Sequence, residues 1–389
     1  MPSILLHPHE LVLKGLNRSR FLDRLVENVR DATRGKGIAR IARVSGGLLL
    51  LLDAEADEKE LLEILSRIPG IANLMLVYET APTLEALKER MAEELASRKM
   101  TTFRITARRS DKTFPLDSLA LQKELGAWVV EKTQAKVNLL EAETDIFVDV
   151  SRKRILFGFE KVQGQGGLPV GVSGNVLALL SGGFDSPVAS WMMMRRGCHV
   201  AFAHFHSYPY VSRRSQEKAK KLAAELARFQ GRSTLFLIPF GDVQREVLLS
   251  APARYRVLLY RRFMMRIAAR IAKSRSALAL VTGENLGQVA SQTLENIAAI
   301  ENASPLPVFR PLIGMHKDEI IGYARRIGTY EISCMPDEDC CQLFMPSHPA
   351  TRSHASDFET IEQKLPCEEL IEQATAHTEK EEFSFRPKA

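Results

Sequence analysis

The sequence predicts an α/β protein with small α+β domains first and a doubly wound parallel sheet after them. The chain has 389 residues, whereas a single hydrophobic core rarely grows beyond roughly 250–300 residues. Up to residue 161, helical and strand-like segments alternate in short modules. After residue 174, apolar strand-like runs and helical patterns alternate strictly, which is typical of a doubly wound sheet.

The first part is expected to contain two domains, at 1–56 and 57–161. Helical spacing and apolar runs predict helices at 18–30, 58–67, 84–98 and 118–133, and strands at 47–52, 102–107 and 144–150. The segment 162–174 is predicted to be a linker, because five glycines fall within its last twelve residues. The main domain boundary is therefore expected there.

The second part, 175–350, is predicted to be the doubly wound domain. Its pattern predicts strands at 176–180, 199–205, 234–238 and 277–281, and helices at 187–197, 212–229, 253–273 and 317–327. In such a fold the ligand crevice lies at the carboxyl ends of the strands. Residues 351–389 carry 5 basic and 9 acidic residues, whereas the preceding 350 carry 48 and 38. We expect an acidic C-terminal segment held apart from a basic body that binds a polyanion.

Composition excludes several classes of protein. Hydrophobic residues make up 45% and charged residues 26% of the chain, so it is expected to be neither disordered nor fibrous. Apolar runs such as 48–52 are far shorter than a membrane-spanning helix, and the first ten residues do not resemble a secretory signal. The five cysteines are an odd number and favour reduced thiols over a disulfide framework. The expected location is the cytoplasm, with no membrane partner.

One loop is predicted to bind phosphate. Ser181-Gly182-Gly183-Phe184-Asp185-Ser186 follows the strand at 176–180 and precedes a helix. Adjacent glycines let several backbone amides face one anion, and the helix adds its positive end. Asp185 could hold Mg²⁺ beside the phosphates. The lysine of a Walker motif and the GxGxxG of a dinucleotide fold are both absent from this loop.

The loop resembles the SGGxDS signature of the PP-loop ATP pyrophosphatases. Further motifs at 13–18, 107–115, 282–293 and 338–341 resemble, in the same order, those of the tRNA 4-thiouridine synthetases. The resemblance covers nearly the whole chain and implies a ferredoxin-like domain, a THUMP domain and a PP-loop domain. It also implies adenylation of the O4 of a uridine, with position 8 of tRNA expected, followed by replacement of that oxygen with sulfur.

The resemblance implies a set of ATP contacts in the last domain. These are Leu179, Leu180, Ser181, Gly182, Gly183, Asp185, Ser186, His204, Phe205, Arg261, Gly283 and Gln292. Gln292 is expected on the helix that follows Gly283. Lys317 begins a predicted helix, where the dipole disfavours a cation, so either an anionic ligand faces it or it is a surface lysine. The family makes this lysine essential, and we expect it to stabilise charge on the α-phosphate.

Two groups of cations are candidates for contact with RNA. Arg104, Arg108, Arg109 and Lys112 lie on or after the strand at 102–107, and the THUMP resemblance favours RNA phosphates over a solvated loop. The segment 254–275 has 8 basic and no acidic residues, and Arg262, Arg266 and Arg270 fall on one helical stripe. A solvated face would normally mix both signs, so a surface facing tRNA or ATP is favoured, with Arg262 and Arg266 predicted to contact RNA.

The adjacent Cys340 and Cys341 lie in a polar segment. Adjacent cysteines do not suit one zinc ion, and no CxxC pair is present. The family implies a cysteine that carries persulfide sulfur here; the alignment favours Cys340, with Cys341 second and able to resolve a disulfide. Some members continue into a rhodanese domain linked to thiamine synthesis; with only residues 342–389 after Cys341, none is expected here. Sulfur is therefore expected in trans, from a cysteine desulfurase or another persulfide donor.

Two alternative functions stay open at the level of the sequence. One is another PP-loop adenylating enzyme, such as a tRNA 2-thiouridine synthetase or an amidating ligase. The other is a non-catalytic tRNA-binding protein that keeps the nucleotide fold, although the intact loop at 181–186 argues against it. The sequence also leaves a homodimer open.

Overall fold

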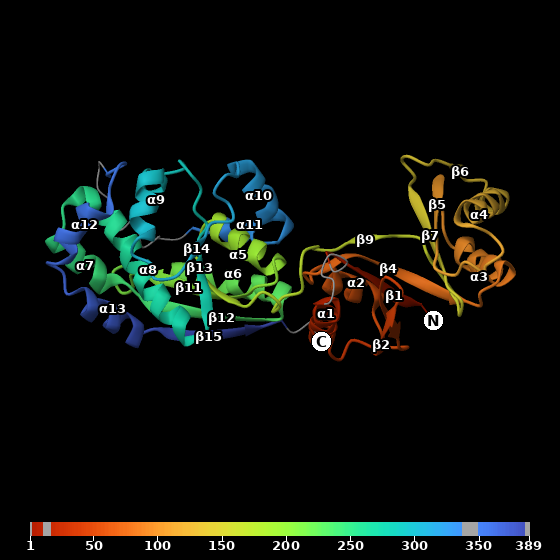
Figure 1. Ribbon diagram of the computed structural model, residues 1–389, viewed down its shortest axis with the longest axis horizontal. Helices are drawn as coiled ribbons and strands as arrows, with labels where there is room; N and C mark the ends of the chain where they lie inside the picture. The colour runs from red at the N-terminus through yellow and green to blue at the C-terminus, as the bar shows by residue number, and fades with distance from the viewer. Residues whose placement is uncertain (1, 11–16, 337–348, 386–389) are drawn as a thin grey trace. The chain divides into compact units, whose positions relative to one another are not determined.

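The computed structural model describes residues 2–10, 17–336 and 349–385. The chain forms two compact units, Met1–Gly167 and Leu168–Ala389 (Figure 1). The point of division lies inside the segment 162–174 that the glycine content marked as a linker. Each unit has its own sheet and its own hydrophobic cores.

The first unit is built on one mixed sheet with strand order β2-β3-β1-β4-β8-β7-β5-β6, and β9 pairs with β4. Its strands are β1 Ser3–Pro8, β2 Ile38–Val44, β3 Gly47–Leu52, β4 Ile71–Thr80, β5 Thr102–Arg109, β6 Lys136–Val137, β7 Thr144–Val150, β8 Ile155–Gly158 and β9 Val162–Gln163. The long β4 pairs with β1 and, through its last residues, with β8. It therefore belongs to both modules of this unit.

Helices α1 (Arg18–Ala32) and α2 (Glu58–Ser66) pack on the first of these modules. Leu61 and Leu65 of α2 share one core with Ile4 and Leu6 of β1. The predicted domain boundary after residue 56 therefore falls too early, because it separates α2 from the core that buries its apolar face. Sequence periodicity finds the helix, whereas only packing shows to which domain it belongs.

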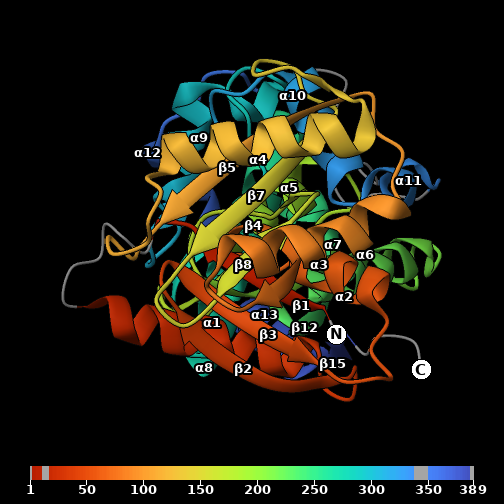
Figure 2. The ribbon, with the colours of Figure 1, turned by 90° about the vertical axis from the view of Figure 1, so that its right-hand side faces the viewer.

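Helices α3 (Leu84–Ala96) and α4 (Ser118–Thr133) cover the second module, and Figure 2 shows α4 over β5 and β7. Thr83 and Asp117 cap the two helices by accepting hydrogen bonds from backbone amides of the first turn. Such caps satisfy amides that have no partner inside the helix. Both helices begin at the residue that the sequence predicts.

The second unit has the sheet order β14-β13-β10-β11-β12-β15, and all strand pairs except β12 with β15 are parallel. Its strands are β10 Asn175–Leu179, β11 His199–His206, β12 Arg232–Pro239, β13 Ala277–Val281, β14 Val308–Phe309 and β15 Glu379–Ser384. This confirms the predicted doubly wound fold. The chain moves outward from β10 in both directions, so the crevice at the switch point lies between β10 and β13.

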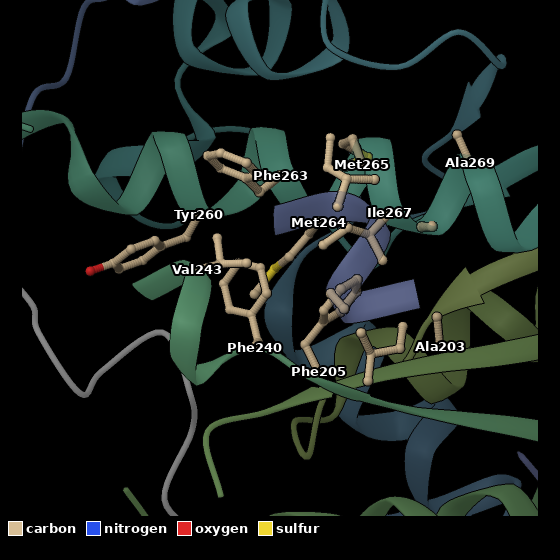
Figure 3. Close-up of a cluster of buried hydrophobic side chains, with 14 of the residues drawn as sticks. Ala203, Phe205, Phe240, Val243, Tyr260, Phe263, Met264, Met265, Ile267 and Ala269 are labelled. Carbon is tan, nitrogen blue, oxygen red and sulfur yellow. The ribbon is translucent and has the colours of Figure 1, made fainter. Parts of the chain in front are cut away.

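Helices cover both faces of this sheet (Figure 1). They are α5 Asp185–Arg195, α6 Arg214–Gln230, α7 Gly241–Ser250, α8 Arg256–Ser274, α9 Leu294–Glu301, α10 Lys317–Arg326, α11 Tyr330–Cys334, α12 Ala355–Glu362 and α13 Cys367–Ala376, with the short 3₁₀ turns η2 Ala253–Tyr255 and η3 Ala290–Gln292. Figure 3 shows part of the core between β11 and α8, which includes Phe205, Phe240 and Met264. On β10, Leu177 joins this core, while Val176 and Ala178 join the core on the other face.

The acidic C-terminal segment is part of the second unit, so the expectation that it is held apart is wrong. Phe358 of α12 and Ile371 of α13 are buried in the core beside α8. Strand β15 extends the sheet by pairing antiparallel with β12. The charge count includes only the polar faces of these elements. It takes no account of the apolar stripe that packs them onto the domain.

Candidate nucleotide site and basic surfaces

The loop between β10 and α5 folds around two serine side chains. Ser186 Oγ accepts a hydrogen bond from the Ser181 amide at 2.9 Å and lies 3.1 Å from Ser181 Oγ. Ser181 Oγ in turn accepts from the Gly183 amide at 3.3 Å. Helix α5 begins at Asp185, two residues before the predicted start at Pro187. Asp185 and Ser186 therefore lie in its first turn, where backbone amides face outward and favour an anion.

A second glycine fixes the loop from the neighbouring strand. Gly283 follows the end of β13, and a Cβ atom at this position would lie 2.6 Å from the Ser186 nitrogen and 2.7 Å from the Asp185 carbonyl carbon. A Cβ atom does not approach backbone atoms this closely unless the backbone shifts. Only glycine at 283 lets the two strand ends meet at the switch point.

These strand ends surround a cavity of about 340 Å³. Every residue that the family resemblance assigned to ATP lines it. The cavity is also lined by eight residues that were not predicted as contacts: Ala203, Ser215, Met264, Met265, Thr282, Glu284, Gln288 and Val289. The volume is that of a small-molecule site, and the location is where this fold binds ligands.

Asp185 and Lys317 form an ion pair at the edge of the cavity. Lys317 Nζ donates to the two Asp185 carboxylate oxygens at 2.7 and 3.0 Å. The lysine is the first residue of α10, as predicted, and its Nζ lies 5.6 Å from the centre of the Phe184 ring. The side chains of Lys317 and Asp185 are 42% and 21% exposed. Asp185 lines the cavity, and Lys317 is joined to it through this pair.

Glu284 is a central buried charge that the sequence reading did not assign. Its carboxylate accepts from Arg261 Nη1 at 2.8 Å, from Arg310 Nε at 2.8 Å and from Thr282 Oγ1 at 3.0 Å. Its side chain is 6% exposed. The carboxylate fixes Arg261 at the cavity wall. The sequence could have pointed to Glu284, because it follows Gly283 within the motif at 282–293.

Two further polar side chains have free hydrogen-bonding capacity at the cavity. Gln292 Oε1 and Ser215 Oγ are buried and have no partner among the described residues. Gln292 ends the turn η3 and does not lie on the helix where it was predicted, since α9 begins only at Leu294. His204 is buried on β11 and donates through Nδ1 to the Leu180 carbonyl at 2.9 Å. Such groups are suited to orient a polar ligand.

The predicted RNA cations of the first unit have different environments. Arg104 Nη2 pairs with Asp145 at 2.9 Å, and Arg109 Nη1 donates to two loop carbonyls, of Phe114 and Leu116, at 3.0 Å each. Arg108 and Lys112 are exposed. Arg104 and Arg109 therefore hold the local backbone, whereas Arg108 and Lys112 present charge to the surroundings.

The predicted RNA-facing stripe on α8 is wrong. Arg262 is 2% exposed, and its Nε and Nη2 donate to Glu362 at 2.7 and 2.9 Å. Arg266 Nη2 binds the same carboxylate at 2.6 Å, and Arg270 pairs with Glu368. The acidic partners come from α12 and α13, about a hundred residues later in the chain. A local charge count could not see them.

The cysteines predicted to carry sulfur, Cys340 and Cys341, lie outside the described residues. Within residues 2–10, 17–336 and 349–385, no group of three or more His, Cys, Asp or Glu side chains is placed to hold a metal ion. The same residues contain no helix long and apolar enough to cross a membrane.

Comparison with known proteins identifies the family. Family models match in the order predicted: the ThiI ferredoxin-like domain at residues 3–74, the THUMP domain at 78–159 and the thiamine biosynthesis protein (ThiI) at 171–367. A probable tRNA sulfurtransferase of Thermus thermophilus is 49% identical over 97% of this chain and 92% of its own. The chain belongs to the ThiI family of tRNA sulfurtransferases. A second such relative, from Brevibacillus brevis, is 40% identical over 99% of this chain and 97% of its own.

Solved structures of other proteins agree with this family. The crystal structure of a 4-thiouridine synthetase in complex with RNA and with bound ATP superposes with a TM-score of 0.89 at 34% identity, over 99% of this chain and 100% of the other. PH1313 from Pyrococcus horikoshii superposes with a TM-score of 0.64 at 23% identity, over 84% of this chain and 100% of its own, and shares the fold.

Proposed function

We propose that this member of the ThiI family is an ATP-dependent tRNA sulfurtransferase that converts a uridine, at position 8 of tRNA, to 4-thiouridine. The observation that carries the proposal is the cavity at the switch point. The loop at 181–186, Asp185 and two buried polar side chains without a partner among the described residues line this cavity, and Lys317 pairs with Asp185. The predicted ATP contacts are proposed as such on the same ground.

The proposed first step is adenylation of the uridine. Its O4 attacks the α-phosphorus of ATP, the bond between the α- and β-phosphates breaks, and pyrophosphate leaves. The amides of the loop at 181–186 hold the departing phosphates, and Lys317 Nζ stabilises charge on the α-phosphate. Arg261, fixed by Glu284, provides a further positive group at the wall.

Asp185 suits a magnesium ion at the phosphates. Its carboxylate lines the cavity next to the loop, and Mg²⁺ commonly binds one or two carboxylates together with substrate phosphates. When bound, the ion would neutralise part of the phosphate charge. Lys317 bridges both carboxylate oxygens and so holds the carboxylate in position.

The proposed second step delivers sulfur. A persulfide on Cys340 attacks C4 of the adenylated base, the bond from C4 to O4 breaks, and AMP leaves. Cys341 then attacks Cys340 Sγ; the sulfur–sulfur bond breaks and leaves 4-thiouridine, and an external thiol reduces the resulting disulfide. A cysteine desulfurase in trans is the proposed donor, and the cytoplasm, where thiols stay reduced, is the proposed compartment.

RNA contact is proposed for the cations of the THUMP module. Arg108 and Lys112 are the exposed members of the predicted set and would bind phosphates directly. Arg104 and Arg109 would act by holding the strand and the loop that carry them. These contacts position the tRNA and do not read the modified base.

The test is nucleoside analysis by mass spectrometry of unmodified tRNA after incubation with the protein, Mg-ATP, cysteine and a cysteine desulfurase. Wild type is compared with Asp185→Asn and Cys340→Ser. We expect 4-thiouridine with the wild type and its loss in both variants. Cys340→Ser should still convert ATP to AMP and pyrophosphate in the presence of tRNA, whereas Asp185→Asn should not.

The controls separate the reaction from its alternatives. Cys198→Ser removes a buried cysteine outside the cavity and should leave the product unchanged. Formation of 2-thiouridine would instead favour another PP-loop thiolase. An Asp185→Asn variant that makes 4-thiouridine at the wild-type rate would refute the assigned role of the loop.

A further inference from the structure

A second cavity, of about 320 Å³, lies beside the start of α6. It is lined by Arg213, Arg214, Glu217, Lys218, Lys221, Met335 and Pro336. The first five residues belong to the N-cap and the first turns of α6, and the last two follow α11. The cavity is separate from the nucleotide site, and the proposed reaction steps assign it no role.

The charge in this cavity is strongly positive. Among the described residues, four cations line it against one carboxylate, Glu217, which lies 3.5 Å from Lys220 Nζ. Lys220 also binds Glu381 on β15 at 2.8 Å, away from the cavity. The carboxylate is thus partly neutralised from outside, whereas the exposed Arg213, Arg214 and Lys221 lie close together and repel each other. An anion in the cavity would remove this repulsion.

The cations are arranged to receive an anion. Lys218 Nζ donates to the Met335 carbonyl at 2.7 Å, which fixes one wall of the cavity. The Arg213 guanidinium lies 4.5 Å from the centre of the Tyr208 ring, which limits its motion. Arg213, Arg214 and Lys221 are exposed at the rim. Two guanidinium groups and an ammonium around one cavity match the oxygens of a phosphate.

This cavity is adjacent to the nucleotide site through two elements. Ser215, on the same turn of α6 as Arg214, lines the nucleotide cavity. Ser333 of α11 donates through Oγ to the Gly183 carbonyl of the loop at 3.3 Å, two residues before Met335. Along a helix three residues advance by about 4.5 Å. Lys218 therefore lies within one helical turn of a residue that faces the nucleotide.

We propose that this second cavity binds backbone phosphates of the RNA strand that carries the target uridine. The inference rests on the proposed function, because a uridine that enters the nucleotide cavity brings its own flanking phosphates close to α6. The alternative occupant is an acidic surface of the sulfur donor. A concave site with two arginines fits single phosphate groups better than a broad protein surface, which would need a larger area.

The test is a triple variant, Arg213→Gln, Arg214→Gln and Lys221→Gln, which leaves Lys218 and its wall contact intact. The matched control is Lys273→Gln, Arg275→Gln and Lys364→Gln, which removes the same charge from exposed positions outside both cavities. Affinity for an unmodified tRNA transcript is measured by fluorescence anisotropy over a range of salt concentrations. KM values for tRNA and for ATP are measured in the thiolation assay.

We expect the triple variant to weaken tRNA binding at least tenfold at low salt. The slope of log affinity against log salt should decrease by about two to three, since each lost phosphate contact removes roughly one. KM should rise for tRNA and stay unchanged for ATP, while the control changes little. Thermal melting of the triple variant should match the wild type, and Lys221→Glu alone should reproduce the direction of the effect.

Two results would overturn the inference. Equal losses in the triple variant and the control would mean that only net charge matters. Unchanged tRNA affinity with weakened binding of the cysteine desulfurase would assign the cavity to the protein donor. If the wild type makes no 4-thiouridine but the triple variant still weakens tRNA binding selectively, the proposed function fails while the phosphate site stands.

Discussion

The carboxylate of Glu362 is the clearest point at which to test what holds the C-terminal segment on the domain. Substitution Glu362→Gln keeps the size of the side chain and removes its charge. Arg262 would then be buried with the Ala299 carbonyl and a neutral amide as its acceptors. The matched control is Glu368→Gln on α13, which breaks the Arg270 pair at the surface.

The burial of the two pairs sets the expected magnitudes. The side chains of Arg262 and Glu362 are 3% and 11% exposed, and removing one partner of a buried pair costs about 3–5 kcal/mol. We expect the lower value, about 3 kcal/mol, because the glutamine oxygen still accepts one bond. The side chains of Arg270 and Glu368 are 41% and 80% exposed, so Glu368→Gln should cost at most about 0.5 kcal/mol.

The pH dependence follows from the same contacts. Burial alone would raise the pKa of Glu362, but the hydrogen bonds and charges of Arg262 and Arg266 outweigh it and lower the pKa. Because the pKa of Glu362 is lower in the folded chain than in the unfolded chain, its ionised carboxylate stabilises the fold at pH values above the unfolded pKa, about 4.3. This contribution disappears as the pH falls through the folded pKa. The difference between wild type and Glu362→Gln should therefore be large at pH 7 and small in acid.

The assays are denaturant unfolding and thermal unfolding, both followed by tryptophan fluorescence in a Trp128→Phe background. The chain has two tryptophans, so Trp191, fully buried in the second unit, becomes the only reporter. For a unit of this size, about 3 kcal/mol corresponds to a Tm lower by roughly 6–12 °C. Equal effects of Glu362→Gln and Glu368→Gln, or a difference that does not change between pH 7 and acid, would refute the reasoning.

Three further outcomes are expected. Gly283→Ala should lower kcat/KM for ATP at least a hundredfold while tRNA affinity is retained, because its Cβ would displace the backbone at Ser186; wild-type kinetics would show that the loop can shift freely. Lys317→Met should lower kcat about 10²–10³-fold with a smaller change in KM for ATP, and a change in KM alone would indicate ground-state binding only. Burial raises the pKa of the Cys198 thiol, so alkylation followed by mass spectrometry at pH 8 should modify the exposed Cys334 before the buried Cys198, and the reverse order of these two would contradict the packing.

The sequence by itself determined the fold class, most of the helices and the position of the loop that we propose binds phosphate. Helical periodicity and strand alternation are local, so α4, β7 and β13 span the residues predicted for them. The loop at 181–186 was predictable because its chemistry needs glycines and a helix start that are contiguous in the chain. The remaining residues proposed to contact ATP came from the family resemblance, and they line one cavity.

Tertiary structure decided what depends on residues far apart in the chain. Glu362 meets Arg262 across 100 positions, and Lys317 meets Asp185 across 132. When only neighbouring residues in the sequence are considered, the arginines of α8 have no acidic partners, and residues 351–389 form a separate acidic tail. Folding brings these opposite charges together, because burial of the apolar faces of α12 and α13 carries their carboxylates to α8.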